Sequence, residues 1–342
     1  MKKRGFYLAL IATLLASFVV GMGAYTRLVH AGLGCPDWPG CYGFLVVPET
    51  PEQISIAQQL FPDAPVEVEK GWPEMTHRYI AGTLMLLVLA IVFQAFKYRK
   101  EEGQPVKVPV FILALIILQA AFGMWTVTLK LWPQVVTAHL LGGFATFSLL
   151  FLLTLRLSGI QWKKFPDKIK GLKRLRVLGV TGLLVVVMQI SLGGWTSSNY
   201  AALACPDLPT CQEQWLPPMN FSEGFNISQS IGPNYLGGQL HAAARTAIHF
   251  THRIGAILTF LLLSLLVWQT FKVSGEMSRR SRSSLRMFAL LVLVILIVQI
   301  CLGLGNIIWS LPLNIAVAHN LGGALLLISL VAYNFRLRRA EV

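Results

Sequence analysis

Long apolar runs separated by short polar segments follow one another along the whole chain. Each run reaches the roughly 20 residues that a helix needs to cross a bilayer, and hydrophobic residues make up 55% of the sequence. Charged residues account for only 13%, against roughly a quarter in soluble domains. The pattern therefore predicts an integral membrane protein. Eight spanning helices are expected, at residues 6–27, 75–96, 107–129, 134–155, 176–196, 245–271, 287–309 and 313–335.

The second half of the sequence repeats the first. The passage QAAFGMWTVTLKLWPQVVTAHLLGG matches QICLGLGNIIWSLPLNIAVAHNLGG, and shorter matches surround a Thr-His-Arg and a Cys-Pro-Asp motif in each half. The matched side chains are His77 with His252, His139 with His319, Cys35 with Cys205, and Cys41 with Cys211. The predicted fold class is all-α integral membrane, with eight transmembrane helices as two tandem, pseudo-symmetric four-helix bundles. We place the N-terminal bundle at 1–161, a basic cytoplasmic linker at 162–176 and the C-terminal bundle at 177–342.

Charge predicts how the helices are oriented. The net charge of +14 comes from basic segments at both termini and in alternate loops, whereas the long loops at 30–73 and 197–243 carry most of the acidic residues. Because basic loops stay cytoplasmic, we expect a multi-pass protein of the bacterial inner membrane with both termini in the cytoplasm. This topology accounts for the positive charge, so we expect no nucleic-acid partner. The first span resembles a signal peptide, but its end matches that of the fifth span, so we expect it to be retained.

Four of the five cysteines lie in the two exported loops. An oxidising exterior favours disulfides there, and the simplest pairing joins Cys35 to Cys41 and Cys205 to Cys211, because Pro and Asp between the partners favour a tight turn. A reactive thiol pair is an alternative. A metal site is another, although the spacer is longer than zinc motifs usually have. Cys301, within the seventh span, is expected to be an ordinary buried thiol.

Four histidines lie near the outer ends of apolar spans, at repeated positions: His77, His139, His252 and His319. A single histidine there could be hydrogen-bonded to a neighbouring helix, but a repeated set points to ligands. In a four-helix bundle, the second and fourth helices are parallel and sit diagonally across the core. Each half then offers two opposed imidazoles without a shell of carboxylates or thiolates. This arrangement suits an iron porphyrin better than zinc or calcium.

The residues next to these histidines also bear on a porphyrin site. Gly-Gly pairs follow His139 and His319, and they leave room either for a flat macrocycle or for close helix packing. Arg78 and Arg253 directly follow the other two histidines. Their guanidinium groups are candidates to pair with heme propionates, with snorkelling to lipid headgroups as the alternative.

The two halves differ at one position near the first histidine of each. Glu74 precedes His77 by three residues, so both lie on one helix face, whereas the matching position in the second half is His249. A carboxylate beside a heme ligand can move protons or stabilise developing positive charge. The alternative is an interfacial residue in the first turn of the helix. The asymmetry favours chemistry in the first half and a permanent cofactor in the second.

Taken together, these motifs resemble the heme A synthase family over essentially the whole chain. The resemblance implies oxidation of a methyl substituent of heme O to a formyl group, through successive hydroxylations, to give heme A for cytochrome oxidase. It implies that His252 and His319 bind the iron of a heme b, and that His77 and His139 surround the iron of the substrate heme. Glu74 would be essential to turnover.

The expected partners follow from the same resemblance. Heme O is the implied substrate and membrane lipid the surroundings, with heme O synthase, an electron donor and a second copy of the chain as candidate partners. His30, His241 and His249 have no assigned role. A non-catalytic diheme b electron carrier is the main alternative function. A transporter built on repeats is a weaker one, because the spans lack the charges that mark an ion path.

Overall fold

A computed structural model describes residues 2–160 and 169–338. These residues form ten α-helices and two isolated β-bridges. Eight of the helices are long and apolar enough to cross a membrane: α1 (Phe6–Leu28), α3 (Val68–Lys97), α4 (Lys107–Thr128), α5 (Pro133–Leu157), α6 (Leu172–Ser198), α8 (Ala242–Ser274), α9 (Arg279–Ile308) and α10 (Leu313–Arg338). The predicted all-α membrane fold is confirmed. Part of the proposed linker, residues 162–168, lies outside the described residues.

Several helices extend beyond the apolar spans that predicted them. Helix α3 begins at Val68 and α9 at Arg279, seven and eight residues before the predicted starts at 75 and 287. The helices continue into polar segments, and α3 does so even through Pro73, so hydropathy marks the lipid-facing part of a helix and not its ends. Two short helices, α2 (Pro51–Leu60) and α7 (Phe221–Gly224), lie in the long loops. Thr50 and Gln53 form a capping box at the start of α2.

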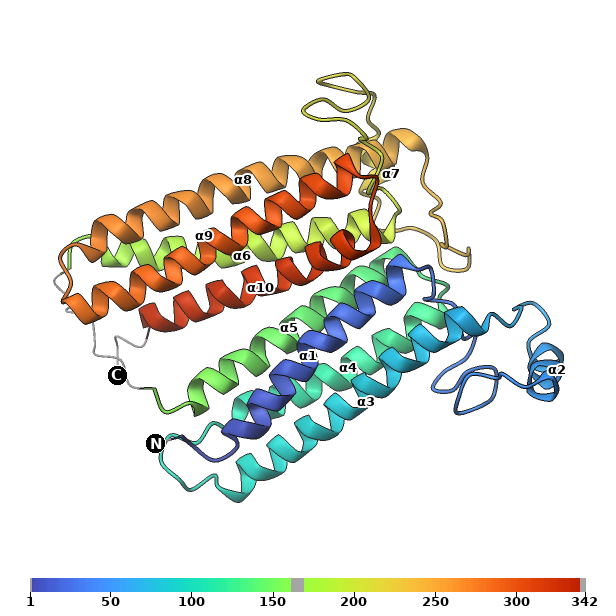
Figure 1. Ribbon diagram of the computed structural model, residues 1–342, viewed down its shortest axis with the longest axis horizontal. Helices are drawn as coiled ribbons and strands as arrows, with labels where there is room; N and C mark the ends of the chain where they lie inside the picture. The colour runs from blue at the N-terminus through green and yellow to red at the C-terminus, as the bar shows by residue number, and fades with distance from the viewer. Residues whose placement is uncertain (1, 161–168, 339–342) are drawn as a thin grey trace.

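Each half forms a square of four helices (Figure 1). In the first half α1 and α4 each pack against both α3 and α5; in the second, α6 and α9 each pack against both α8 and α10. Within the described residues, α3 does not closely approach α5, and α8 does not closely approach α10. The histidine-bearing helices therefore lie on the diagonals of the two squares, as the sequence predicted.

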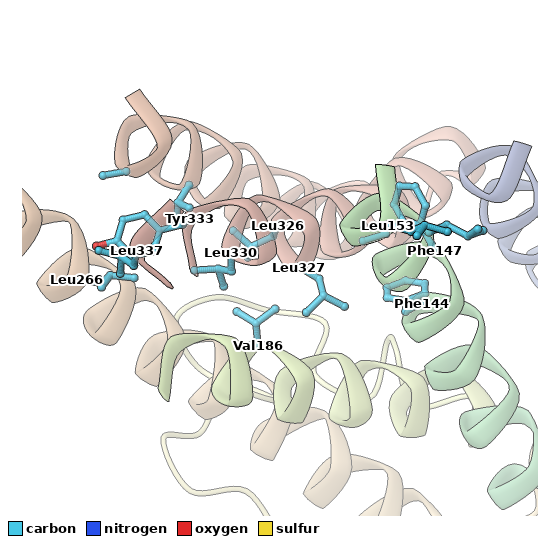
Figure 2. Close-up of a cluster of buried hydrophobic side chains, with 14 of the residues drawn as sticks. Phe144, Phe147, Leu153, Val186, Leu266, Leu326, Leu327, Leu330, Tyr333 and Leu337 are labelled. Atoms are coloured by element: carbon cyan, nitrogen blue, oxygen red, sulfur yellow. The ribbon is translucent and has the colours of Figure 1, made fainter. Parts of the chain in front are cut away.

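The two halves pack against each other through α1 and α5 on one side and α6 and α10 on the other. Figure 2 shows side chains of α5, α6 and α10 in one apolar cluster, among them Phe144, Val186 and Leu327. Lipid is as apolar as leucine, so this cluster stabilises the fold by close van der Waals packing rather than by exclusion of water.

Polar contacts join the halves at the end of the molecule where α2 and α7 lie (Figure 1). Arg27, in the last turn of α1, donates at 2.7 Å to the Tyr200 hydroxyl and at 2.7 Å to the Ser197 carbonyl. Its guanidinium also lies 4.1 Å from the centroid of the Tyr200 ring. The hydroxyls of Thr137 and Ser198 are 3.1 Å apart. These bonds fix the end of α1 and the start of α5 to the end of α6.

The second long loop also reaches over the first half. Trp132 Nε1 donates to the Gln229 carbonyl at 3.0 Å, and the Tyr235 amide donates to the Lys130 carbonyl at 3.0 Å. Gln134 binds the same loop through its side chain. The turn between α4 and α5 is therefore covered by a segment that belongs to the other half, and this contact ties the halves together.

The close approach of α5 and α6 is testable at Gly194. A Cβ atom built there would lie 3.3 Å from Thr137 Cγ2 and 3.5 Å from Leu140 Cδ2. We expect Gly194→Leu to lower the free energy of unfolding by about 1–3 kcal/mol through overpacking, seen as a lower Tm of the purified protein in detergent. Gly194→Ala should fall between this variant and wild type. A wild-type Tm for Gly194→Leu would contradict the packing.

Candidate functional site

The four histidines of the apolar spans lie on four different helices. His77 lies on α3, His139 on α5, His252 on α8 and His319 on α10. The rings of His77 and His139 are close enough to interact electrostatically, and so are those of the other two. The structure therefore brings together one pair of imidazoles in each half.

Each imidazole ring faces a glycine on an adjacent helix. A Cβ atom built on that glycine would lie 3.0 Å from ring Cε1 for Gly23 and His77, 3.6 Å for Gly123 and His139, 3.2 Å for Gly193 and His252, and 3.1 Å for Gly303 and His319. At three of the four positions this is tighter than an ordinary contact, so a side chain would press on the ring. The glycines make the space that the rings occupy.

A pair of imidazoles is a donor set that a heme iron accepts. The Nδ1 atoms of His77, His139 and His319 are buried without a hydrogen-bond partner, and such atoms call for an explanation such as a bound ligand. A porphyrin supplies the equatorial nitrogens, so its iron needs protein ligands only along the axis. Structural zinc needs a complete tetrahedral set. Among the described residues, no cluster of three or more histidine, cysteine or acidic side chains is placed to hold a metal ion.

The room predicted beside the Gly-Gly pairs is only partly present. A Cβ atom on Gly142 would lie 1.8 Å from Nε2 of Gln119, and one on Gly322 would lie 2.2 Å from Oε1 of Gln299. These two glycines therefore serve close helix packing, which was the alternative interpretation. Nothing lies within 4 Å of a Cβ built on Gly143. Open space is therefore present beside the second glycine of the first pair.

Glu74 is buried nearly two turns inside α3, because that helix begins at Val68. Its Oε2 accepts the backbone N–H of Cys35 at 3.0 Å, and its Oε1 accepts from Arg78 Nη2 at 2.5 Å. A residue in this position does not cap the first turn, so the interpretation of Glu74 as a helix-end residue is wrong. The carboxylate ties the first long loop to the helix that carries the first histidine.

His249 takes the same position in the second half. Its ring is buried, and Nδ1 accepts the backbone N–H of Cys205 at 3.1 Å. Glu74 and His249 therefore make the same structural contact, each binding the amide of the first cysteine in its loop. What distinguishes the halves is the carboxylate and its ion pair with Arg78. The asymmetry seen in the sequence concerns charge and not architecture.

Arg78 and Arg253 both donate hydrogen bonds to carbonyl groups of the cysteine loops. The acceptors are Asp37, Pro39 and Gly40 for the first arginine, and Cys205, Asp207 and Thr210 for the second. The two guanidinium groups hold the loops against the histidine helices. Pairing of either arginine with a heme propionate stays a prediction.

The cysteines of the two long loops pair within each loop, as predicted. Disulfides join Cys35 to Cys41 and Cys205 to Cys211. The observed pairing overturns the metal alternative, whereas the reactive-thiol alternative stays open because a redox-active pair also forms a disulfide. Cys301 differs from its prediction, because its thiol is free and exposed on α9 instead of buried. Hydropathy could not reveal this, since a lipid-facing position and a core position both select apolar residues.

An aspartate braces the turn inside each disulfide loop. Asp207 accepts the backbone amides of Gln212 and Glu213 and the hydroxyl of Thr210. The Thr210 hydroxyl, and then the two amides, hold the pKa of Asp207 below its ordinary value. Asp37 accepts two backbone amides in the first loop in the same way. The Cys-Pro-Asp motif is therefore a loop-forming unit.

The two remaining histidines lie outside the apolar core. His30 stacks on Tyr200, with ring centroids 5.7 Å apart, and partial burial followed by the charge of Arg27 lowers its pKa. His241 is exposed and places Nδ1 2.8 Å from Glu223 Oε1. Hydrogen bonds from the His241 amide and ring lower the pKa of Glu223. Both histidines support loop structure at the same end of the molecule.

Comparison with known proteins agrees with this arrangement. The family model described as COX15-CtaA, cytochrome oxidase assembly protein, matches residues 6–331. The chain belongs to this family. A protein named heme A synthase from Shewanella oneidensis is 48% identical over 96% of this chain and 94% of its own length. Heme A synthases of Beijerinckia indica (28% identity, 96% of this chain and 91% of theirs) and Staphylococcus saprophyticus (25%, 97% and 95%) are also similar.

Membership of the COX15-CtaA family confirms the resemblance drawn from the motifs, and the match extends over both halves. The motifs did not assign a role to the glutamines that pack against the histidine helices. Gln119 and Gln299 align in the repeat, and Gln189 takes the same position in α6. The signal that identifies them is spacing, because each precedes by four residues the glycine that faces a histidine ring.

The disulfide pairing is testable by thiol labelling of denatured, non-reduced protein. Of the five cysteines, we expect only Cys301 to react, because the others are bonded within their loops. Intact-mass measurement should show a single adduct before reduction and labelling of every cysteine after it. Labelling of Cys35 and Cys41 before reduction would contradict the pairing.

Proposed function

We propose that this member of the COX15-CtaA family is a heme A synthase, which oxidises a methyl substituent of heme O to a formyl group through successive hydroxylations. The observation that carries the proposal is the identity of 48% with the Shewanella oneidensis heme A synthase over nearly both full lengths. Two opposed histidine pairs in an apolar bundle support it, because both hemes and the long isoprenoid tail of heme O belong in a bilayer.

We assign the resident cofactor, heme b, to the C-terminal half at 177–342, with His252 and His319 as its iron ligands. Heme b would supply a one-electron redox centre. The Nε atom of Arg253 is buried without a partner and so retains a donor for a propionate. Heme O would bind in the N-terminal half at 1–161, with His77 and His139 on either side of its iron and Arg78 near its propionates.

Glu74 is the proposed catalytic carboxylate. It lies one turn before His77 on the same face of α3, and it is buried, where a charge acts more strongly than in water. Its two oxygens already accept bonds from Cys35 and Arg78, so its position is fixed before substrate arrives. From there it would stabilise positive charge that develops on the substrate, or accept a proton.

The surroundings follow from the basic segments and the family. The protein is proposed to lie in the bacterial inner membrane with both termini cytoplasmic, so that the disulfide loops and the histidine sites are near the outer face. Heme O synthase and an electron donor are the proposed partners, and a homo-oligomer is the proposed assembly. The product would be heme A for cytochrome oxidase.

Pigment analysis of the purified protein tests the assignment of the two halves. Because loss of one axial ligand leaves the iron open, His252→Ala and His319→Ala should lose heme b or convert it from low spin to high spin. His77→Ala and His139→Ala should retain heme b and fail to form heme A. Extraction of hemes with mass analysis separates the outcomes. Two b-type hemes and no heme O or A would favour the diheme carrier, and absence of pigment would favour the transporter.

The role of Glu74 is tested by giving the first half the residue of the second. Glu74→His keeps an acceptor for the Cys35 amide, as His249 does for Cys205, but removes the carboxylate. We expect this variant, like Glu74→Gln, to contain heme b and accumulate heme O or a partly oxidised heme. The reciprocal His249→Glu is the control and should leave heme A formation largely intact. Normal heme A from Glu74→His would restrict Glu74 to holding the loop.

A further inference from the structure

A glutamine packs beside three of the four histidines. Gln119 of α4, Gln189 of α6 and Gln299 of α9 each lie one helical turn before the glycine that faces a histidine ring. The helix pair α1–α3 departs from this pattern. Val19 on α1 stands where the other helix pairs have glutamine. Ile80 on α3 stands where they have the glycine that packs against that glutamine. Only His77 therefore has no glutamine in this repeated position.

In the second half the glutamines contact the histidines directly. Gln189 Nε2 donates to the His252 carbonyl at 2.9 Å and lies 3.1 Å from the ring Nδ1 of the same residue. Gln299 Nε2 donates to the His319 carbonyl at 2.9 Å and lies 3.5 Å from its ring Nε2. One amide thus touches both the backbone and the ring of a single histidine. Such a contact sets the rotation of the ring relative to its helix.

Glycines on the histidine helices make room for these amides. A Cβ atom on Gly255 would lie 2.2 Å from Gln189 Oε1, and one on Gly322 would lie 2.2 Å from Gln299 Oε1. Both Oε1 atoms are buried without a hydrogen-bond partner. A buried amide oxygen beside a histidine ring, with no partner of its own, is an acceptor available to that ring.

We propose that Gln189 and Gln299 are positioning residues for the two heme b ligands, His252 and His319. A histidine that binds iron through one ring nitrogen carries its proton on the other, and that N–H needs an acceptor. Rotation of the glutamine amide exchanges Oε1 and Nε2: it gives up the bond from Nε2 to the histidine carbonyl and brings Oε1, which has no partner, to the ring N–H. The loaded protein would therefore hold each ring through a hydrogen bond to Oε1, which fixes its orientation and raises its basicity. This inference rests on the proposed heme b site.

The first half lacks the complete set of glutamine–histidine contacts. Among the described residues no hydrogen bond joins Gln119 to His139, and Val19 faces the helix of His77. Its histidines therefore lack the side-chain amide contacts of the second half. A resident cofactor gains from two fixed ligands, whereas a substrate heme must enter and leave.

The test compares Gln189→Leu, Gln299→Leu and Gln189→Glu in full-length protein purified with heme b. Removing the acceptor should weaken heme b binding by about 10–100-fold, raise its midpoint potential and shift the electron paramagnetic resonance signal of its low-spin ferric iron. Gln189→Glu, a stronger acceptor of the same shape, should lower the potential. Gln119→Leu is the matched control from the first half, and its heme b should match wild type.

Gly255→Ala provides a second route, because its methyl group would displace the Gln189 amide and should reproduce Gln189→Leu. Wild-type occupancy, potential and resonance signal in both leucine variants would overturn the proposal, as would equal changes in Gln119→Leu. Failure of the heme b site itself is separately visible. If the heme b site is wrong, His252→Ala and His319→Ala would keep heme b. If these two variants lose heme b and the glutamine variants behave as wild type, only the role of the glutamines is overturned.

Discussion

An imidazole ring fits between two closely packed membrane helices only where the facing helix has no side chain. All four rings meet this condition, because Gly23, Gly123, Gly193 and Gly303 stand opposite them. Helices in lipid associate by close packing, so a pair that separated to admit a ring would lose contacts along its whole length. A single glycine lets the pair stay closed above and below the ring. The geometry of both sites therefore depends on the space that these glycines leave by having no side chain.

The two disulfide loops are fixed to the same helices that carry the histidines. Each loop is closed by a disulfide, braced by an aspartate, and bound through the amide of its first cysteine to a residue one turn before a histidine. An arginine directly after that histidine binds the loop carbonyls. A displacement of the loop would therefore also displace the histidine ring on that helix. In the first half this link passes through Glu74, so the proposed catalytic charge and the loop are parts of one hydrogen-bonded unit.

The spans, the two-fold repeat, the diagonal histidine helices and the disulfide pairing could be predicted from the sequence, because each depends on spacing or on a difference in polarity. The start of α3 at Val68 could not, since hydropathy marks lipid and not helix ends. The exposure of Cys301 could not be predicted either, because hydropathy does not separate lipid-facing from core positions. The contacts of Arg78 and the packing of Gly142 against Gln119 depend on how side chains meet between helices. The spacing of residues along one helix does not predict these contacts between helices.

The differences between the halves concentrate on one helix pair. Val19 on α1 replaces a glutamine, Ile80 on α3 replaces its facing glycine, and Glu74 on α3 replaces a histidine, whereas α4 and α5 keep Gln119 and Gly142. This pair of helices therefore lacks the glutamine contact and carries a buried carboxylate one turn before its histidine. Both changes favour a site that exchanges its occupant and acts on it. The second half has glutamine contacts at both of its histidines, so the two halves of one repeated scaffold differ in ring contacts and in charge without a change of fold.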